Sequence, residues 1–551
     1  MSKKKLFTLI IIAIIALLLR IWHLDKPEGL WNDEYVSWFI SSQRPFSHFC
    51  REIFNNCHMP IYYIYLKIWS FLFSDSDISL RFSSVLCSVA SVFVIFFAGK
   101  EFKDEKTGFL AALLCTLSSF LIYFAQEVRI YSLLFLFSSY SLWAWIKCAK
   151  NFTKINFLNL LFANILIVFT HTIGIVFVAF NVLALLIYKR KEENLNFQKG
   201  LKLFFPYLFI MILISPFIYK LISSNTLSQF WSNFNFSKVY FVLSDYFSPL
   251  QVNVINTPKN ILSVAFKNNS FNIGFIVFSL LPALISVGLI IRSLKDRIIK
   301  YYALSCASFF LVLILAAMIG KIVFITKYSI EIYPFLIVAI SCSLLTLNKK
   351  IFVPLFSFLL LINSSYLIFA KHSAPKLTRP EGNFAPVAMI EQAGLNKDDM
   401  IVLMYYDRHF FEKYFDSTQY NILEITKYTY PYFLFSSTPE LKNIIRDKNL
   451  EHYEFFKNND TTYFEQAFKN EIYNKVPKHA KVAFVFLDSV AFYSLNNIQT
   501  FSEKEYKQTP FIFLAFSYLR NNIINVAQAN NMKLNLFLEA GQWCLLEFEK
   551  E

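Results

Sequence analysis

The chain has 551 residues, of which 56% are hydrophobic, 19% aromatic and 17% charged, and its formal net charge is +15. Its mean hydropathy is +0.44. Soluble globular proteins carry about a quarter charged residues, so this composition is typical of a membrane protein. It excludes a disordered chain, which would be poor in aromatic residues, and 11 Gly and 17 Pro exclude a collagen-like chain.

The basic excess is confined to one part of the chain. From Lys371 onward there are 20 Lys and Arg against 22 Asp and Glu, whereas residues 1–370 hold 33 against 16. The charge therefore accompanies the apolar part, and it is not the solvated basic face of a nucleic-acid-binding protein. We predict two domains, residues 1–370 in the membrane and residues 371–551 outside it.

Long apolar runs fill residues 1–370. A bilayer core of about 30 Å needs about 20 apolar residues per helix, and the pattern predicts about eleven transmembrane helices. These are Leu6–Ile21, Ile78–Ala98, Gly108–Phe124, Ile130–Ile146, Phe157–Thr170, Ile173–Tyr188, Leu203–Leu221, Phe271–Ile291, Tyr301–Gly320, Ile332–Leu347 and Ile351–Ala370. Met59–Phe73 is shorter and contains Lys67, so it is expected to lie at the membrane interface as an amphipathic helix.

Basic residues on alternate loops predict the orientation of the chain. Lys3–Lys5 precede the first span. This span lacks the small-residue cleavage site of a signal peptide, so it is predicted to remain as a membrane anchor. Lys and Arg favour the cytoplasmic side, so we expect a cytoplasmic N-terminus and a multi-pass protein of the cell membrane. The other basic loops on that side are Lys100–Lys106, Lys147–Lys154, Lys189–Lys191, Arg292–Lys300 and Lys349–Lys350. An odd number of spans then places the C-terminal domain outside the cytoplasm.

The C-terminal domain has the pattern of a small α/β domain. Met400–Tyr406 and Val482–Asp488 are predicted buried strands, and Ala385–Gly394 is a predicted helix that ends at its glycine. The aromatic segment Tyr428–Phe435 either contacts sugar or belongs to the core. No residue of this domain points to a particular chemistry.

The cysteines offer no metal-binding pattern. Neither a CxxC motif nor a Cys/His spacing typical of zinc occurs among the eight Cys. Cys50 and Cys57 share the first outer loop, and they form a disulfide only if the compartment is oxidising. We expect no cofactor, with a divalent metal ion as the open alternative.

Two adjacent carboxylates, Asp33 and Glu34, follow the first span within Gly29–Tyr35. Like charges oppose joint ionisation, which raises the pKa of one of the two groups and suits it to act as a general base. The alternative is a solvated pair that caps a short helix, since Asn32 and Asp33 are good N-cap residues.

A second polar cluster lies where the third predicted span leaves the membrane and the fourth begins. It contains Gln126, Glu127, Arg129 and Tyr131. Ionisable groups at membrane depth are costly unless they are paired or line a wet cavity. A surface pair of Glu127 and Arg129 in a tight turn is the alternative.

Several other polar residues fall on the same predicted side of the membrane. For His171 the alternative to a functional role is a structural one. For Arg81 and Lys327 the alternative is that the side chain extends its charge to the membrane–water interface. The full set is His58, Tyr62, Arg81, His171, Lys327 and Tyr328. Their shared side favours one site that combines carboxylates with cations.

These motifs together resemble a known family. The resemblance extends from about Leu6 to Arg190. It rests on Leu30–Tyr35, His58–Tyr63, Leu66–Trp69, Asp77–Phe82, Gln126–Tyr131 and Thr170–His171. The chain resembles bacterial membrane glycosyltransferases of the protein O-mannosyltransferase and aminoarabinose-transferase type, family 39, which have the GT-C fold.

The resemblance implies a reaction and a role for each group. Such enzymes transfer a sugar from a polyprenyl-phosphate donor to an acceptor hydroxyl on the extracytoplasmic face, and direct attack would invert the anomeric centre. The acceptor would be a protein, a lipid or another glycan. Asp33 would be the general base, Glu34 its motif partner and Glu127 the acidic residue of the second loop. The substrate-binding set would be His58, Tyr62, Arg81, Gln126, Arg129, Tyr131, His171, Lys327 and Tyr328.

The chain departs from the family pattern at two places. His58-Met59-Pro60 stands where relatives often have His-Pro-Pro, and Lys327-Tyr328 stands where they often have Arg-Tyr. Lys supplies a charge but no bidentate fork for the phosphate.

Other functions fit parts of the pattern. A polytopic transporter or flippase would place its polar residues at mid-depth and show paired repeats with broken helices. A polysaccharide polymerase or ligase would use a lipid-diphosphate donor, and a non-catalytic assembly protein would retain only the fold.

Overall fold

The computed structural model divides into two compact units. The first comprises Met1–Asp25 and Val36–Leu377, and the second comprises Lys26–Tyr35 and Thr378–Glu551. The structure describes residues 2–26, 29–56, 58–193, 197–223, 234–247, 266–267, 270–271, 276–319, 322, 324–372, 384–405, 413–426, 461–487, 522–540 and 543–551. Cys57 and Tyr428–Phe435 lie outside these ranges.

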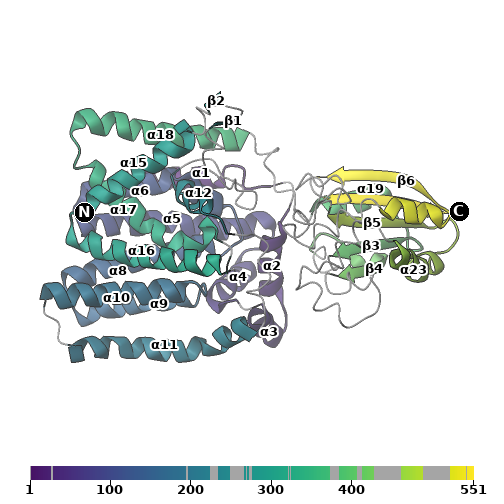
Figure 1. Cartoon of the computed structure of the whole chain (residues 1–551), viewed down its shortest axis with the longest axis horizontal. Coiled ribbons are helices and arrows are strands. Elements are labelled where there is room, and N and C mark those ends of the chain that lie inside the picture. The colour runs from purple at the N-terminus through teal and green to yellow at the C-terminus, as the bar shows by residue number, and fades with distance from the viewer. Residues whose placement is uncertain are drawn as a thin grey trace. The chain divides into compact units, whose positions relative to one another are not determined.

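The first unit is built from helices whose long axes run roughly alongside one another (Figure 1). The helices before the loop that contains Gln126 and Arg129 are α1 (Lys3–Ile21), α2 (Asn32–Ser42), α3 (Phe46–Asn55), α4 (Pro60–Leu72), α5 (Asp77–Phe102), α6 (Glu105–Leu117) and α7 (Ser119–Ala125). Then follow α8 (Tyr131–Lys150), α9 (Lys154–Val168), α10 (Gly174–Glu193), α11 (Phe197–Ser223) and α12 (Ser237–Asp245). After the short strands β1 (Phe266–Lys267) and β2 (Ser270–Phe271) come η3 (Ile276–Leu280), α15 (Leu281–Ser293), α16 (Arg297–Met318), η4 (Thr326–Ile332), α17 (Tyr333–Leu344) and α18 (Lys349–His372).

Each of the eleven predicted spans overlaps a helix of this unit. Within the described ranges, four helices are long and apolar enough to cross a membrane, or five if the bent pair α6–α7 counts as one. The chain is therefore a multi-pass helical membrane protein, while the number of crossings stays a prediction. The predicted interfacial segment forms α4, with Pro60 in its first turn, as the fixed φ of proline favours.

The predicted span Gly108–Phe124 is not one helix. It breaks at Ser118 into α6 and α7, whose axes differ by 59°. The Ser118 hydroxyl accepts a hydrogen bond from Leu121 N at 3.3 Å, and it shares a second with the Tyr333 hydroxyl at 2.8 Å. A serine side chain that caps a new helix competes with continuation of the old one, which an apolar count cannot detect.

Arg20 fastens α1 to this break. Its side chain is fully buried, and it donates to Ser88 Oγ at 2.8 Å and to the carbonyl oxygens of Cys115 and Thr116, each at 3.1 Å. The last carbonyls of a helix lack partners within the helix. The guanidinium therefore satisfies the C-terminal end of α6 inside the apolar bundle.

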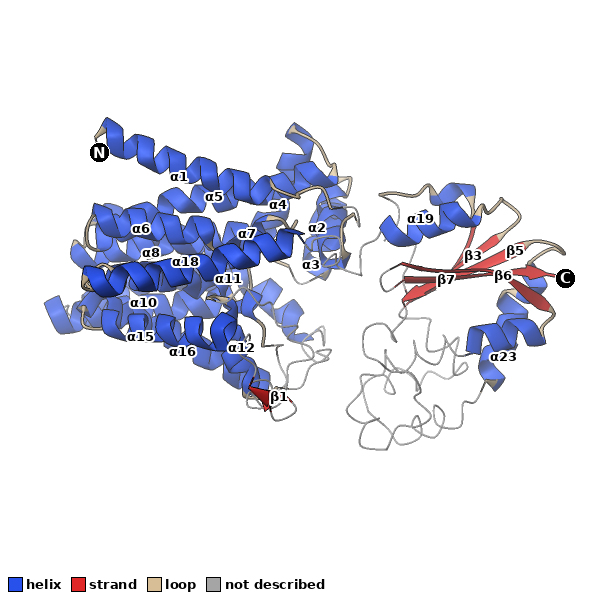
Figure 2. Cartoon of the chain, turned by 90° about the horizontal axis from the view of Figure 1, so that it is seen from above, coloured by secondary structure: helices blue, strands red, loops and turns tan. Residues whose placement is uncertain are grey.

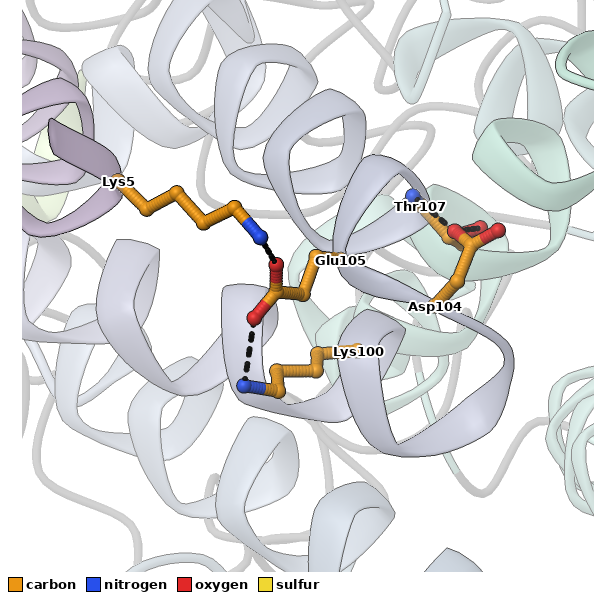
Figure 3. Close-up of polar contacts among 5 residues, drawn as sticks. All are labelled: Lys5, Lys100, Asp104, Glu105 and Thr107. Atoms are coloured by element: carbon orange, nitrogen blue, oxygen red, sulfur yellow. Dashed lines mark hydrogen bonds and ion pairs between the residues drawn. The ribbon is translucent and has the colours of Figure 1, made fainter. Parts of the chain in front are cut away.

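The opposite end of α6 is held by charged side chains (Figure 3). Asp104 caps the helix by accepting from Thr107 N at 2.8 Å, and Glu105 lies between the ammonium groups of Lys5 and Lys100. These contacts join α1, α5 and α6 at the end of the bundle where the basic loops lie.

The second unit contains a five-stranded sheet in the order β4-β3-β5-β7-β6. Its strands are β3 (Met400–Tyr405), β4 (Asn421–Thr426), β5 (Lys481–Leu487), β6 (Met532–Ala540) and β7 (Trp543–Lys550). β3 is parallel to β4 and β5, and β7 is antiparallel to β5 and β6. The helix α19 (Phe384–Ala393) lies on one face and α23 (Thr462–Glu471) on the other (Figure 2).

The elements predicted for this unit form, although the unit also includes Lys26–Tyr35, which was predicted to belong to the membrane domain. Both predicted strands form, as β3 and β5, and the predicted helix forms as α19, followed by Gly394 at φ +59°. Residues on both faces of β3 are buried, with Met400 and Val402 in one apolar cluster and Ile401 and Leu403 in the other. Burial on both faces explains why these strands are continuous apolar runs rather than alternating ones.

Gly108 allows α5 and α6 to approach closely. A Cβ at this position would lie 2.6 Å from the backbone oxygen of Phe96, while a Cβ at Gly288 would meet nothing within 4 Å. We expect Gly108→Ala to lower the free energy of unfolding by about 1–3 kcal/mol through overpacking. Gly288→Ala should be neutral or stabilising by about 0.5–1 kcal/mol. Thermal unfolding in detergent measures both, and equal effects of the two substitutions would contradict the packing.

Candidate functional site

The candidate residues divide between the two units. Asp33 and Glu34 belong to the segment Lys26–Tyr35 of the second unit, and the remaining candidates belong to the first unit.

Asp33 and Glu34 occupy the first turn of α2 and differ in environment. Glu34 is fully buried, and its Oε2 accepts a hydrogen bond from Trp31 N at 3.3 Å. This is the return contact of a capping box, in which an N3 glutamate binds the N-cap N–H. Asp33 remains partly exposed. The alternative of a solvated pair is therefore wrong for Glu34, while Asp33 is the more accessible carboxylate.

The segment before α2 is held by the second unit. Leu30 is buried, and its N–H donates to the Tyr414 hydroxyl at 2.7 Å. The backbone that leads into the carboxylates is thus fixed by a residue almost 400 positions later in the sequence.

The turn between α7 and α8 is anchored to the end of α1. Gln126 Nε2 donates to the carbonyl oxygens of Arg20 and Trp22 at 2.8 and 2.7 Å, so its amide nitrogen has a structural role. Glu127 is 1% exposed, which rules out the alternative of a surface pair. Arg129 Nη1 donates to Ser37 Oγ at 3.2 Å.

Two cations flank the ring of Tyr131. Arg129 Cζ lies 5.9 Å from the ring centroid and Lys327 Nζ lies 5.7 Å from it. Lys327 Nζ is also 5.8 Å from the centroid of Tyr328. The negative faces of aromatic rings stabilise cations at these distances. Tyr131 itself is 1% exposed, so both cations contact a buried ring.

His171 lies beside this pair, in the turn between α9 and α10. Its ring centroid is 5.9 Å from that of Tyr328, and its Nδ1 is buried without a hydrogen-bond partner in the part of the chain that the structure describes. Burial, together with the charges of His58, Arg129 and Lys327, lowers the pKa of His171 to about 3. Gly174 permits the turn, because a Cβ there would lie 2.6 Å from Ile167 Cγ2.

His58 reaches the cluster from the start of α4. Its ring stacks on that of Tyr63 with centroids 5.1 Å apart, and the buried Tyr62 packs edge-on against Tyr63 at 5.4 Å. Ile61 N donates to Phe169 O at 3.0 Å, which ties the beginning of α4 to the turn that carries His171. Segments far apart in sequence therefore bring His58, Arg129, His171 and Lys327 together.

Arg81 is enclosed by other residues of the first unit. It is 1% exposed, and its Nη1 lies 3.4 Å from the carbonyl oxygen of Leu24. The alternative that it extends to the interface is wrong, because the guanidinium is enclosed by the first unit.

Sequence reasoning missed three residues of this region. Ser37 carries no sequence signal that separates it from other helix residues, while Tyr63 ends the motif His58–Tyr63 and could have been chosen on that ground. Glu331 does have one, since it is an acidic residue inside an apolar stretch. It is 1% exposed, and both carboxylate oxygens lack hydrogen-bond partners among the described residues. The described ranges contain no group of three or more His, Cys, Asp or Glu able to hold a metal ion.

The depressed pKa of His171 predicts acid sensitivity. Unfolded histidine has a pKa near 6.5, so between that value and about 3 the unfolded state binds more protons than the folded state, and stability falls as the pH falls. The loss attributable to His171 is about 2 kcal/mol between pH 7 and pH 5. Thermal unfolding over this range should show a shallower pH dependence for His171→Gln than for wild type. His48→Gln, at an exposed position, should retain the wild-type slope. Equal slopes for His171→Gln and wild type would contradict the prediction.

Comparisons with known proteins agree with this architecture. Residues 58–219 match the model of the family described as dolichyl-phosphate-mannose-protein mannosyltransferase. No protein of assigned function matches the sequence.

Solved structures match over almost the whole chain. ArnT from Cupriavidus metallidurans bound to undecaprenyl phosphate is 10% identical, with 99% of this chain and 98% of that chain covered and a TM-score of 0.52. The same enzyme in the apo state gives 11% identity, 98% and 97% coverage and a TM-score of 0.51. The oligosaccharyltransferase AglB from Archaeoglobus fulgidus gives 11% identity, 97% and 73% coverage and a TM-score of 0.49. The chain therefore shares the GT-C fold of the ArnT structures, and its residues 58–219 resemble the dolichyl-phosphate-mannose-protein mannosyltransferase family.

Proposed function

We propose that this protein transfers a sugar from a polyprenyl-phosphate donor to an acceptor hydroxyl on the extracytoplasmic face of the membrane, with inversion at the anomeric carbon. The observation that supports this most directly is the gathering of Arg129, Lys327 and His171 around Tyr131 and Tyr328, with His58 close enough to affect the charge of His171. The ArnT structure that shares the fold was obtained with undecaprenyl phosphate bound.

A phosphate is the ligand that this cluster suits. Two cations beside one ring repel each other, and a bound anion would offset that repulsion. Arg129 offers a planar fork for two phosphate oxygens, whereas Lys327 offers a point charge. In the departing polyprenyl phosphate the negative charge grows as the glycosidic bond breaks, and fixed cations at that position stabilise the transition state.

His171 would contribute as a neutral group. Its low pKa keeps the imidazole uncharged near neutral pH, so it can donate one hydrogen bond to the phosphate from one ring nitrogen. A bound phosphate would in turn raise the pKa of His171, because an anion nearby favours the protonated ring.

Asp33 is the proposed general base. The acceptor oxygen attacks the anomeric carbon, its proton passes to Asp33, and the bond from that carbon to the phosphate oxygen breaks with its electron pair on the phosphate. The buried Glu34 would hold the N-terminal turn of α2 through Trp31 N and so orient Asp33. The proposed mechanism requires no metal ion. An assay of the purified enzyme with a panel of polyprenyl-phosphate sugars would identify the sugar that is transferred.

Asp33→Asn should reduce transfer by about 10²–10⁴-fold, because the amide cannot accept the proton of the acceptor. The matched control is Asp25→Asn, which removes an exposed carboxylate eight residues earlier and should leave turnover unchanged. The measurement is release of polyprenyl phosphate by the purified enzyme with whichever donor of the panel is active. Near-normal turnover in a folded Asp33→Asn variant would exclude Asp33 as the base.

Arg129→Gln should lower kcat/KM for the donor by about 10²–10³-fold through loss of charge at the phosphate. Lys327→Arg should retain most activity since it preserves that charge, while Lys327→Gln should not. Arg51→Gln is the control, because Arg51 is an exposed residue of α3. Donor binding and turnover should both fall with Arg129→Gln. A loss of turnover alone, with unchanged affinity for undecaprenyl phosphate, would argue against a phosphate contact.

A further inference from the structure

A cavity of about 310 Å³ lies at the other end of the helices from Lys327. It is bounded by the turn between α5 and α6, the turn between α15 and α16, and the C-terminal end of α17. Three cations line it: Lys103, Arg292 and Lys295. None of the groups assigned to sugar transfer contributes to it.

The cavity carries an excess of positive charge. Its single lining carboxylate, Asp296, caps α16 by accepting from Ile298 N at 2.8 Å and Ile299 N at 3.2 Å. Across the part of the chain that the structure describes, no ion pair joins Lys103, Arg292 or Lys295 to a carboxylate within 4.0 Å. Three cations therefore face a space in which one carboxylate is already engaged with backbone amides.

Arg292 is oriented by neutral groups. Its Nε donates to Thr346 Oγ1 at 3.0 Å, and Thr346 Oγ1 donates to Ser343 O at 2.7 Å. These bonds leave the terminal guanidinium nitrogens for a ligand, since they make no hydrogen bond to any described residue. A planar fork held in this way matches the oxygens of a phosphate.

An apolar stripe on α15 leads to the same place. Leu284, Val287 and Ile291 are 59%, 37% and 61% exposed, and their spacing of three and four residues puts them on one face of the helix. Arg292 follows directly at its exposed end. An extended hydrocarbon chain against the stripe would thus end beside a cationic cavity.

The cavity lies at one end of a helical segment that is long and apolar enough to cross a membrane. Thr326–Leu344 is one of the helices able to cross a membrane. Lys327 lies at one end of that segment, while Cys342, Ser343 and Thr346 line the cavity at the other. Basic pockets between transmembrane helices at the membrane surface are suited to anionic lipid headgroups.

We propose that this cavity binds the phosphate of an anionic phospholipid, with one acyl chain of that lipid against the α15 stripe. The lipid is a structural or regulatory ligand, separate from the sugar donor because the two phosphate sites lie at opposite ends of the helices. The proposal holds whether or not the transfer reaction is as described above.

The test is retention of lipid by the purified full-length protein, counted by native mass spectrometry after titration with phosphatidylglycerol. Wild type should retain one tightly bound molecule, and Arg292→Gln with Lys295→Gln should weaken this binding by about 10- to 30-fold. The control is Lys349→Gln with Lys350→Gln, which removes two exposed cations at the start of α18 that do not line the cavity. The control should bind as wild type does, and equal affinity of all three proteins would overturn the proposal.

Two further measurements on wild type distinguish the source of the phosphate. Phosphatidylcholine should bind at least 10-fold more weakly than phosphatidylglycerol, and equal binding would overturn the assignment of an anionic lipid. Glycerol phosphate should compete only at concentrations well above those of the lipid, because it lacks the acyl chain. Equal potency would identify a site for a soluble anion and also overturn the proposal.

Discussion

The first unit depends on the satisfaction of polar groups inside an apolar helix bundle. Arg20 illustrates this constraint. It is fully buried, and its guanidinium donates hydrogen bonds to Ser88 Oγ and to the last carbonyl oxygens of α6. Gln126 then binds the carbonyls of Arg20 and Trp22. The break between α6 and α7, and the turn that presents Arg129, are both fixed by these two side chains.

The same constraint explains the cation cluster. Charged groups near a membrane are costly unless they meet partners, and Arg129 and Lys327 meet the ring of Tyr131 and, for Arg129, the hydroxyl of Ser37. The neutral His171 adds no further charge to the cluster. The cluster therefore keeps two positive charges, which would attract an anion.

Some of the candidate site was predictable from the sequence. The adjacent carboxylates and the loop with Arg129 stand out because charged residues are rare between apolar runs. Their different environments were not predictable, since Glu34 is buried through a backbone contact while Asp33 remains accessible. The contacts of Gln126 with the end of α1 were not predictable either, because its partners lie more than 100 positions earlier.

Local sequence patterns did not predict that Lys26–Tyr35 belongs to the second unit. The sequence did predict the membrane class and a helix at each of the eleven apolar runs, because the bilayer imposes these local signals. It also determined β3, β5 and α19, whose patterns reflect burial within one element. Only the tertiary structure decided that Ser118 breaks a span and that His58, His171 and Lys327 meet beside Arg129. Only it placed Arg292 at the end of an apolar stripe and a cavity. Those outcomes depend on contacts between distant segments, which no local pattern encodes.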